Sequence, residues 1–379
     1  MNGVISVKNV YVLSKKENLL YNLKYMALFF ICLLVSVMMI LYADEAKNSV
    51  YYALNICFQT VIPSLFPFLF LSAFIANTNI LNRKFRLLDK ISMKIFKLPS
   101  KCISVFILSL IGGFPVGAKT VKTMLENKSI TENQAQRLLL FCVNPGPAFA
   151  VTAVGLSLLS NKNTGMIIYL SIALSNFIIA IFSRILDDGS VIENAENKND
   201  INIAFSFVKS GNEAANSCLG ICGYVLLFSC LVSMLHILIE NEQTVDILSG
   251  LLEVTSGCEK LSTYGNIPLL AGIIAWGGIS VHFQIMDCIH KTGLKLKMFL
   301  TARIISSALS IVLCHGLLTL FPEAVNVSLI KSDFNIAPAQ GSFPVSAAML
   351  MTCFLFLIGD YTIKYKIKRL QNVETDRKL

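Results

Sequence analysis

The fold is decided by the stretch LIGGFPVGAK, residues 110–119, and by its later partner CVNPGPAF, residues 142–149. Both stretches have apolar surroundings, and both contain glycines and prolines that end helices. In hydrocarbon every backbone N–H and C=O needs a partner, so a broken helix is tolerated at membrane depth only where protein or a water-filled cavity surrounds it. Two such breaks in one half of a chain predict the substrate site of a transporter.

The composition predicts an integral membrane protein. Of the 379 residues, 55% are hydrophobic and 15% are charged, and the mean hydropathy is +0.66; soluble domains carry about 25% charged residues. The net charge of +9 does not indicate a nucleic-acid partner, because the basic residues flank apolar segments and orient them in the membrane. The eleven cysteines lack metal-binding spacing, so we expect packing residues, with no metal and no cofactor.

The first apolar segments predict two membrane spans. Residues 1–24 are polar and carry four lysines, so the span at residues 25–43 is expected to start from the cytoplasm. A signal peptide is the alternative, but the polar segment before the apolar run is long and no A-x-A cleavage site follows that run. A second span is expected at about 51–76, where Pro63 and Pro67 stand one turn apart and predict a kink or an unwound segment.

A surface helix and a re-entrant hairpin are expected next. Residues 82–101 place apolar side chains on one helical face and lysines on the other, which is typical of a helix lying on an anionic leaflet. The apolar arm at 103–111 is too short to cross a bilayer, which takes about 20 residues. It reaches the glycine tip and returns as the polar AKTVKTMLENKS, so this hairpin enters and leaves on the same side.

An interrupted span follows the first hairpin. Thr131 as N-cap and Gln134 three residues later predict a capping box at the start of a helix. This helix is expected to enter the membrane, to break at NPGP, residues 144–147, and to be followed by a span at about 166–184. The acidic and polar residues 187–202 are the expected linker between two halves of the chain.

The second half repeats this order of features. A span at about 217–239 leads to a second short hairpin, whose tip is expected at Ser256 and Gly257. Gly257 lies 140 residues after Gly117 of the first tip.

A second interrupted span follows that hairpin. Gly277 and Gly278 are expected to break it in the middle. A span at about 298–320 comes next, and a final span at about 346–364 ends in a basic tail.

The lysines and arginines predict the orientation. With the N-terminus inside, 28 of the 32 fall in expected cytoplasmic segments. The two hairpins then enter from opposite faces, which is the inverted-repeat architecture of alternating-access transporters. The predicted fold class is an all-α polytopic membrane protein with about eight transmembrane helices and two re-entrant hairpins in inverted repeats. Its expected segments are the N-terminus and first helix (1–50), first repeat (51–186), cytoplasmic linker (187–202), second repeat (203–320), and the outside loop, last helix and tail (321–379).

Three stretches resemble the YlbJ-type sporulation integral membrane proteins of the nucleoside-recognition Gate superfamily. They are SLFPFLFLS at 64–72, GGFPVGAKTVKTMLENKSITENQAQRLLLF at 112–141, and NPGPAF at 144–149. The resemblance covers about residues 50–320. It implies action in endospore formation and passage of dipicolinic acid across the outer forespore membrane. The second half departs from the pattern, since TSGC at 255–258 stands where a proline-containing tip is expected.

Helix ends at the tips and breaks are the expected binding groups. Each returning arm starts a helix whose N-terminal N–H groups bind carboxylates without any side chain, which suits a pyridine dicarboxylate. For Asn144, ligand contact is expected and N-capping of the helix after its own break is the alternative role. For Lys119, snorkelling to the cytoplasmic interface is slightly favoured over contact with the anion. The expected substrate-binding residues are Gly113, Pro115, Gly117, Lys119, Asn144, Pro145, Gly146, Ser256, Gly257, Gly277 and Gly278.

Ionisable residues in the second half are candidates for ion or proton coupling. Glu253 and Glu259 bracket the expected second tip, and an acidic residue inside a membrane hairpin marks an ion path. The alternative for Glu259 is a pair with Lys260 near the outer face. His282, with Gln284, follows the glycine break and could meet substrate, although a buried hydrogen-bonded histidine is more common.

Three functions remain open on the sequence. A transporter of a small organic anion, dipicolinate if the resemblance holds, is preferred over a nucleoside-type transporter and over a non-transporting spore-assembly membrane protein. No nucleophile–base pair, Walker motif or nucleotide fingerprint is found, so we do not expect an enzyme. The expected partners are a small anionic substrate and the lipid bilayer of the cell membrane or outer forespore membrane. Assembly with identical chains stays open.

Overall fold

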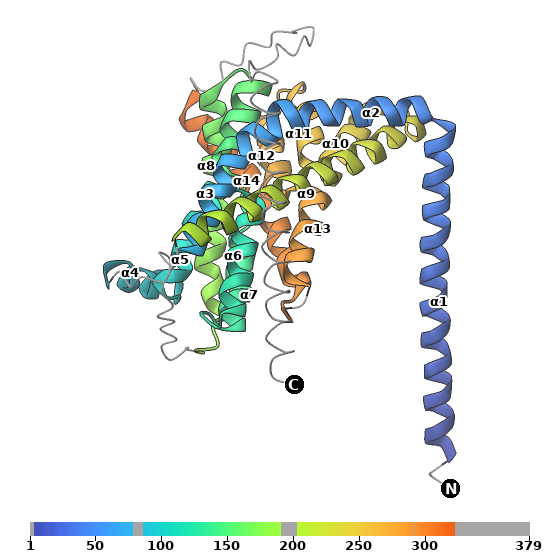
Figure 1. Cartoon of the computed structure of the whole chain (residues 1–379), viewed down its shortest axis with the longest axis horizontal. Helices are drawn as coiled ribbons and strands as arrows, with labels where there is room; N and C mark the ends of the chain where they lie inside the picture. Colours follow the sequence, from blue (N-terminus) through green and yellow to red (C-terminus); the bar gives the residue numbers. More distant parts are fainter. Residues whose placement is uncertain (1–3, 79–85, 191–202, 291, 323–379) are drawn as a thin grey trace, which may run out of the picture.

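Long apolar sequences form helices, and every regular element in the described part of the chain is a helix. The structure is a computed structural model that describes residues 4–78, 86–190, 203–290 and 292–322 (Figure 1). The expected final span at 346–364 and most of the expected linker lie outside these residues.

Five described helices are long and apolar enough to cross a bilayer, so the chain is an α-helical polytopic membrane protein. Two expected spans, the one at 51–76 and the one broken at NPGP, are not among the five. Helix interruptions divide them into shorter apolar helices, Leu65–Asn77 and Ala148–Leu158. The five candidates are Asn22–Leu41, Lys162–Leu186, Ile203–Leu238, Ile267–Ile289 and Leu296–Leu320.

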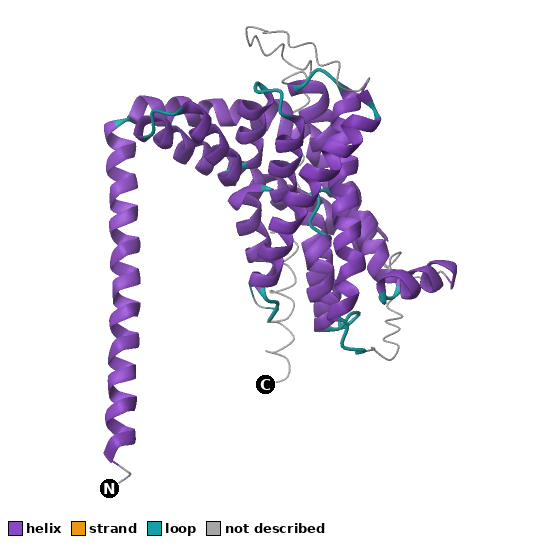
Figure 2. Cartoon of the chain, turned by 180° about the vertical axis from the view of Figure 1, so that it is seen from behind, coloured by secondary structure: helices purple, strands orange, loops and turns teal. Residues whose placement is uncertain are grey.

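The N-terminal helix α1 (Val4–Leu41) stands apart from the rest of the molecule. It meets α2 (Ala43–Ile56) at a corner and runs away from the helical body (Figures 1 and 2). None of the apolar window within Asn22–Leu41 is buried by protein. In a bilayer, lipid therefore has to cover this apolar surface.

Pro63 determines the shape of the next segment. α2 continues through a π-helical turn, η1 (Cys57–Val61), into α3 (Ile62–Asn77), with Pro63 at the start of α3 and Pro67 inside it. A proline lacks an N–H and its ring clashes with the carbonyl four residues earlier. The π-helical turn widens the helix at that point and accommodates the proline. The predicted distortion is confirmed, and it lies just ahead of Pro63.

The two arms of the first hairpin are joined by a single residue. The surface helix α4 (Arg86–Phe96) lies within the predicted range 82–101. It is followed by α5 (Ser100–Gly112) and α6 (Phe114–Glu126), which pack against each other on either side of Gly113.

The capping box at the start of α7 (Glu132–Phe141) is confirmed. The Thr131 hydroxyl accepts a hydrogen bond from the Gln134 N–H at 3.1 Å, and the Gln134 side chain accepts one from the Thr131 N–H at 3.3 Å. After α7 the chain is non-helical through residues 142–146; the helix starts again at Pro147 and continues as the π-helix η3 (Ala148–Leu158). α8 (Lys162–Phe182) and the short 3-10 helix η4 (Ser183–Leu186) complete the first half.

The second half has the same order of long helix, hairpin, interrupted helix and helix. Its first helix, α9, takes in the polar stretch before the expected span at 217–239 and so reaches 36 residues. The interruption between α12 and α13 falls at Gly277, as expected. The elements are α9 (Ile203–Leu238), α10 (Glu242–Leu252), α11 (Val254–Ser262), α12 (Ile267–Trp276), α13 (Gly278–Ile289) and α14 (Leu296–Leu320).

Contacts between the halves pair matching elements. α3 packs along α9, and α8 packs along α14. The segment after each break contacts the returning arm of the other hairpin: α13 packs on α6, and η3 packs on α11. In Figure 1 the labels of α5–α7 lie in the lower part of the body and those of α10–α12 in the upper part.

Two arginines counted with the cytoplasmic charges are in fact buried. Arg137 of α7 is fully buried, forms an ion pair with Asp187 at 2.8 Å, and donates to the carbonyls of Phe96 and Lys97. It thereby joins the end of α4 to α7 and to the segment after α8. Arg303 lies inside α14 and is 1% exposed. Fewer loop charges than the sequence count implies therefore support the predicted orientation.

Candidate functional site

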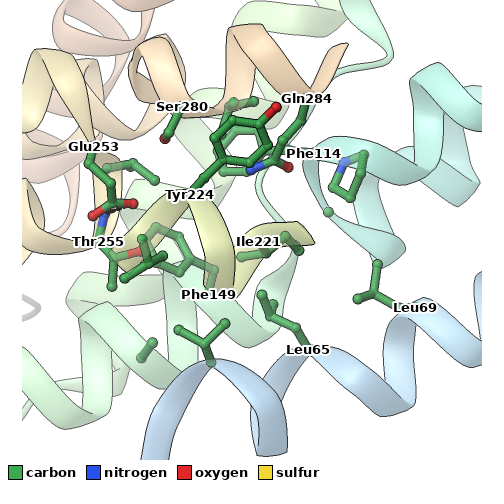
Figure 3. Close-up of a pocket in the computed structure, with 18 of the residues that line it drawn as sticks. Leu65, Leu69, Phe114, Phe149, Ile221, Tyr224, Glu253, Thr255, Ser280 and Gln284 are labelled. Carbon is green, nitrogen blue, oxygen red and sulfur yellow. Dashed lines mark hydrogen bonds between the residues drawn. The ribbon is translucent and has the colours of Figure 1, made fainter. Parts of the chain in front are cut away.

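The hairpin turns and the helix breaks meet around one narrow cavity (Figure 3). The first turn contributes residues 112–115, the first break contributes Gly146, and the second turn contributes residues 253–255. α13 contributes Ser280, Val281 and Gln284 just after the second break. Interruptions that are far apart in the sequence thus surround the same space. The wall is completed by Val61, Leu65, Leu69, Phe149, Ala153, Ile221, Tyr224 and Val225.

Gly113 forms the first turn in a conformation that other residues rarely adopt. Its φ of 85° and ψ of −178° lie in a region that is essentially confined to glycine. The N-terminus of α6 begins here, and no side chain caps it. The turn packs on the first break, since a Cβ on Gly113 would lie 3.5 Å from the Gly146 nitrogen. Gly113, Pro115 and Gly146 of the expected site therefore line the cavity together.

Glu253 forms the second turn, so the expected tip at Ser256 and Gly257 was placed too late. Those two residues lie in the first turns of α11. The Glu253 carboxylate accepts hydrogen bonds from the N–H groups of Thr255 at 2.9 Å and Ser256 at 2.6 Å. A carboxylate in this position satisfies helix N-terminal donors and favours helix initiation. The α11 end thus already holds an anion from its own chain.

Two expected site glycines serve close packing. A Cβ on Gly117 would overlap the carbonyl oxygen of Cys142, and a Cβ on Gly257 would overlap the Cα of Gly250. Gly117 therefore lets α6 approach the end of α7, and Gly257 lets the two arms of the second hairpin touch. Neither residue belongs to the cavity wall.

The second break lies directly behind the second turn. Gly277 ends α12 in the left-handed region, with φ 85° and ψ −6°, and α13 starts without a side-chain cap. A Cβ on Gly278, which has φ 75°, would lie 3.0 Å from the Leu252 carbonyl oxygen and from the Val254 nitrogen. Both glycines support the site from outside the cavity wall. The start of α13 faces the cavity through Ser280.

The polar side chains of the cavity all come from the second half of the chain. Besides Glu253 they are Tyr224, Thr255, Ser280 and Gln284. In Figure 3 Glu253 and Ser280 lie on the side opposite Leu65. Tyr224, Thr255 and Ser280 were not predicted from the sequence. For Tyr224 the sequence signal was its helical spacing from Ile221 and Val225, which places the three side chains on one face of α9.

Asn144 lies outside this cavity, in a buried polar cluster. Its amide donates to the Ser109 hydroxyl and to the Phe141 carbonyl, both at 2.8 Å, and its oxygen accepts from Asn176 at 2.6 Å. The bond to Phe141 satisfies a carbonyl at the C-terminal end of α7, whereas the expected alternative role was N-capping of the helix after the break, which no side chain caps. Pro145 is not part of the cavity wall either.

Arg303 holds this cluster together and was not predicted. Its guanidinium donates to the Asn176 side-chain oxygen at 2.9 Å, to the Leu140 carbonyl at 2.6 Å and to the Val143 carbonyl. α14 of the second half thus satisfies carbonyls that the first break leaves free. The sequence hint was a single arginine inside the apolar run of α14.

Lys119 lies in a different cavity, between α3, α6 and α9. Its ammonium donates to the Ser217 hydroxyl of α9. It is therefore not directed at the central cavity.

The other coupling candidates lie away from the cavity wall. His282 is 4% exposed, and its ring lies 4.2 Å from the Trp276 ring centroid and 5.5 Å from that of Phe299. Glu259 is half-buried on α11. Among the described residues Lys260 pairs with Asp246, at 3.5 Å, and not with Glu259. Of the three coupling candidates, Glu253 is the one in the wall.

Comparison with known proteins gives one informative match. The chain is similar to the sporulation integral membrane protein YlbJ of Bacillus subtilis (strain 168). The two are 23% identical over 299 aligned residues, and the match covers 66% of this chain and 72% of YlbJ. No family model matches the chain, and no solved structure matches it.

The structure agrees with this similarity on a membrane protein, because YlbJ is an integral membrane protein and five described helices are long and apolar enough to cross a bilayer. Within the described residues, no cluster of three or more His, Cys, Asp or Glu side chains is arranged to hold a metal ion.

Proposed function

We propose that the chain is a membrane transporter for a small organic anion, and that the anion is dipicolinate during endospore formation. The observation that carries this function is the meeting of two hairpin turns and two helix breaks around one cavity. Broken helices at a shared site are the usual construction of transporter binding sites. The sporulation context comes from the similarity to YlbJ.

We propose further that the transporter has eight membrane spans and two re-entrant hairpins in inverted halves. The matching contacts of the two halves support this arrangement, because α13 on α6 has its counterpart in η3 on α11. The lysine distribution supports a cytoplasmic entry for the first hairpin and an outside entry for the second. Dipicolinate would cross the outer forespore membrane as the two halves rearrange around the cavity.

Two helix ends are suited to hold the carboxylates. The N-termini of α6 and α13 carry no side-chain caps, so their N–H groups and partial positive charge remain available to an anion. The α11 end is different because Glu253 already occupies it. The apolar wall of Leu65, Leu69 and Phe149 suits an aromatic ring.

Glu253 is the residue that we propose for coupling. Its carboxylate is 2% exposed and shares the cavity with the substrate. A negative charge there would repel a dicarboxylate unless a proton or a metal cation neutralised it. Substrate and neutralising cation would then bind together, and a cation gradient would drive transport.

A nucleoside is the second candidate substrate, on one specific observation. Glu253 and Gln284 lie in the same wall, and carboxylate and amide groups are those expected to bind a ribose or a base. The absence of polar side chains at residues 112–115 of the first turn favours the anion.

Uptake into vesicles tests these assignments. Purified protein in liposomes should accumulate labelled dipicolinate and not uridine, and an inward proton or sodium gradient should stimulate uptake. Glu253→Gln keeps an oxygen acceptor for the α11 cap but removes the charge, so uptake should lose its dependence on the gradient. Uridine uptake without dipicolinate uptake would establish the alternative, and uptake of neither would refute both.

A further inference from the structure

We propose that the cavity around Lys119 is a second anion site, through which the substrate passes between the central cavity and the cytoplasm. It rests on the proposed function, since it supplies the route to the central site. The cavity lies between α3, α6 and α9. Its polar wall consists of Ser72, Asn77, Lys119, Thr120, Thr123, Glu213 and Ser217.

Two groups in the wall of this cavity can donate hydrogen bonds to a bound anion. The Lys119 ammonium has three N–H groups, and one of them is directed at the Ser217 hydroxyl. The Ser72 hydroxyl is fully buried, lines the cavity, and has no hydrogen-bond partner within the described part of the chain. An unpartnered buried hydroxyl is costly, and a bound carboxylate would satisfy it.

The acidic group in this wall is held by other residues. Glu213 accepts from the Asn77 amide at 2.9 Å and lies 3.8 Å from the Lys209 ammonium. Its charge is therefore offset by the amide and by a second lysine. Within the described part of the chain Lys119 has no ion pair of its own, so its ammonium can bind a carboxylate of a ligand in addition to the Ser217 hydroxyl.

A thin partition separates the second cavity from the central one. The Leu69 side chain lines both. A methyl group on Gly112, which faces the central cavity, would clash with Ser72 and Val116, which face the second. The two cavities are thus one residue layer apart, and a movement of Leu69 against Gly112 would connect them.

The second cavity also lies toward the proposed cytoplasmic side. It is formed by the C-terminal part of α3, the middle of α6 and the N-terminal half of α9. The predicted cytoplasmic segments at residues 82–101 and 187–202 adjoin these ends of α3 and α9. An anion from the cytoplasm would therefore meet Lys119 before it meets the hairpin turns.

Ligand protection of an introduced cysteine tests the site. Thr123→Cys places a thiol in the wall, and Asn127→Cys places one at the exposed end of the same helix as a control. Both variants are labelled by a membrane-impermeant thiol reagent in proteoliposomes whose protein has its cytoplasmic face outward. The chain without either substitution gives the background labelling of the native cysteines. Dipicolinate should slow the labelling of Thr123→Cys and not of Asn127→Cys, and its neutral dimethyl ester should protect neither.

Charge variants then assign the protection to Lys119. In the Thr123→Cys background, Lys119→Gln should raise the dipicolinate concentration for half-protection about tenfold or more, because a charge-assisted bond is lost. Lys122→Gln is the matched control, because Lys122 faces Glu126 at 4.0 Å and lies outside the wall. It should leave protection unchanged.

The outcomes separate this site from the function on which it rests. Dipicolinate uptake without protection of Thr123→Cys, or equal protection in Lys119→Gln, would refute the second site and leave the transporter intact. Absence of both uptake and protection would refute the transporter together with the site.

Discussion

The methyl group that Gly113→Ala adds should impair transport through the backbone alone. There is room for it, since the nearest atom to a Cβ at this position is the Gly146 nitrogen at 3.5 Å. The obstacle is the φ of 85° with ψ of −178°, which only glycine adopts readily. Gly223→Ala is the matched control, because Gly223 lies in α9 with nothing within 4 Å of its Cβ position and ordinary helical geometry.

The two substitutions should change the free energy of the folded protein in opposite directions. Forcing alanine into the Gly113 conformation costs about 1–3 kcal/mol. If the turn adopts another conformation instead, the fraction of molecules in which the uncapped N-terminus of α6 faces the cavity falls by about 5- to 150-fold. In contrast, alanine at the helical Gly223 should stabilise the protein by about 0.4–1 kcal/mol.

Dipicolinate uptake per vesicle-inserted molecule measures the first effect, and thermal unfolding in detergent measures the second. Gly113→Ala should lose at least about fivefold in uptake, while Gly223→Ala should transport normally and unfold at a slightly higher temperature. Normal uptake by Gly113→Ala, or an equal loss in both variants, would show that the turn conformation does not matter for transport.

Further predictions concern the supports of the site and the orientation. Arg303→Met should lower stability by at least about 2 kcal/mol in thermal unfolding, because charged donors are removed from buried acceptors; a loss equal to that of exposed Arg184→Met would contradict this. Thr131→Ala should cost about 1 kcal/mol, with Thr131→Ser near wild type; a silent alanine variant would mean that the cap is unimportant. A cysteine at Asn163 should react with an impermeant reagent from outside and one at Asn127 from inside; the reverse pattern would overturn the inverted-repeat topology.

The sequence predicted the interruptions well because proline and glycine act locally. Pro63, the NPGP motif and Gly277 each disturb a helix whatever surrounds them, and the structure has an interruption at each one. The capping box of Thr131 and Gln134 was predictable for the same reason.

The sequence could not place residues whose roles depend on distant partners. The second turn was assigned to Ser256 and Gly257 because glycine suggested a tip, whereas a buried glutamate serves as both turn and cap. The roles of Gly117 and Arg303 depend on backbone atoms of Cys142 and Leu140, which only the tertiary fold brings near. Charge counting likewise treated Arg303 as a loop residue because burial is invisible in a count.

The central claim is that substrate occupies the cavity where turns and breaks meet. The most direct measurement compares dipicolinate uptake by liposomes containing wild type, Ala153→Phe and Leu156→Phe. Ala153 lines the cavity from η3, whereas Leu156 on the same helix is 47% exposed on the outer surface. We predict uptake by wild type and Leu156→Phe at similar rates and none by Ala153→Phe, whose phenyl group would fill the cavity. Uptake by Ala153→Phe at the wild-type rate, or no uptake by wild type above empty liposomes, would contradict the claim.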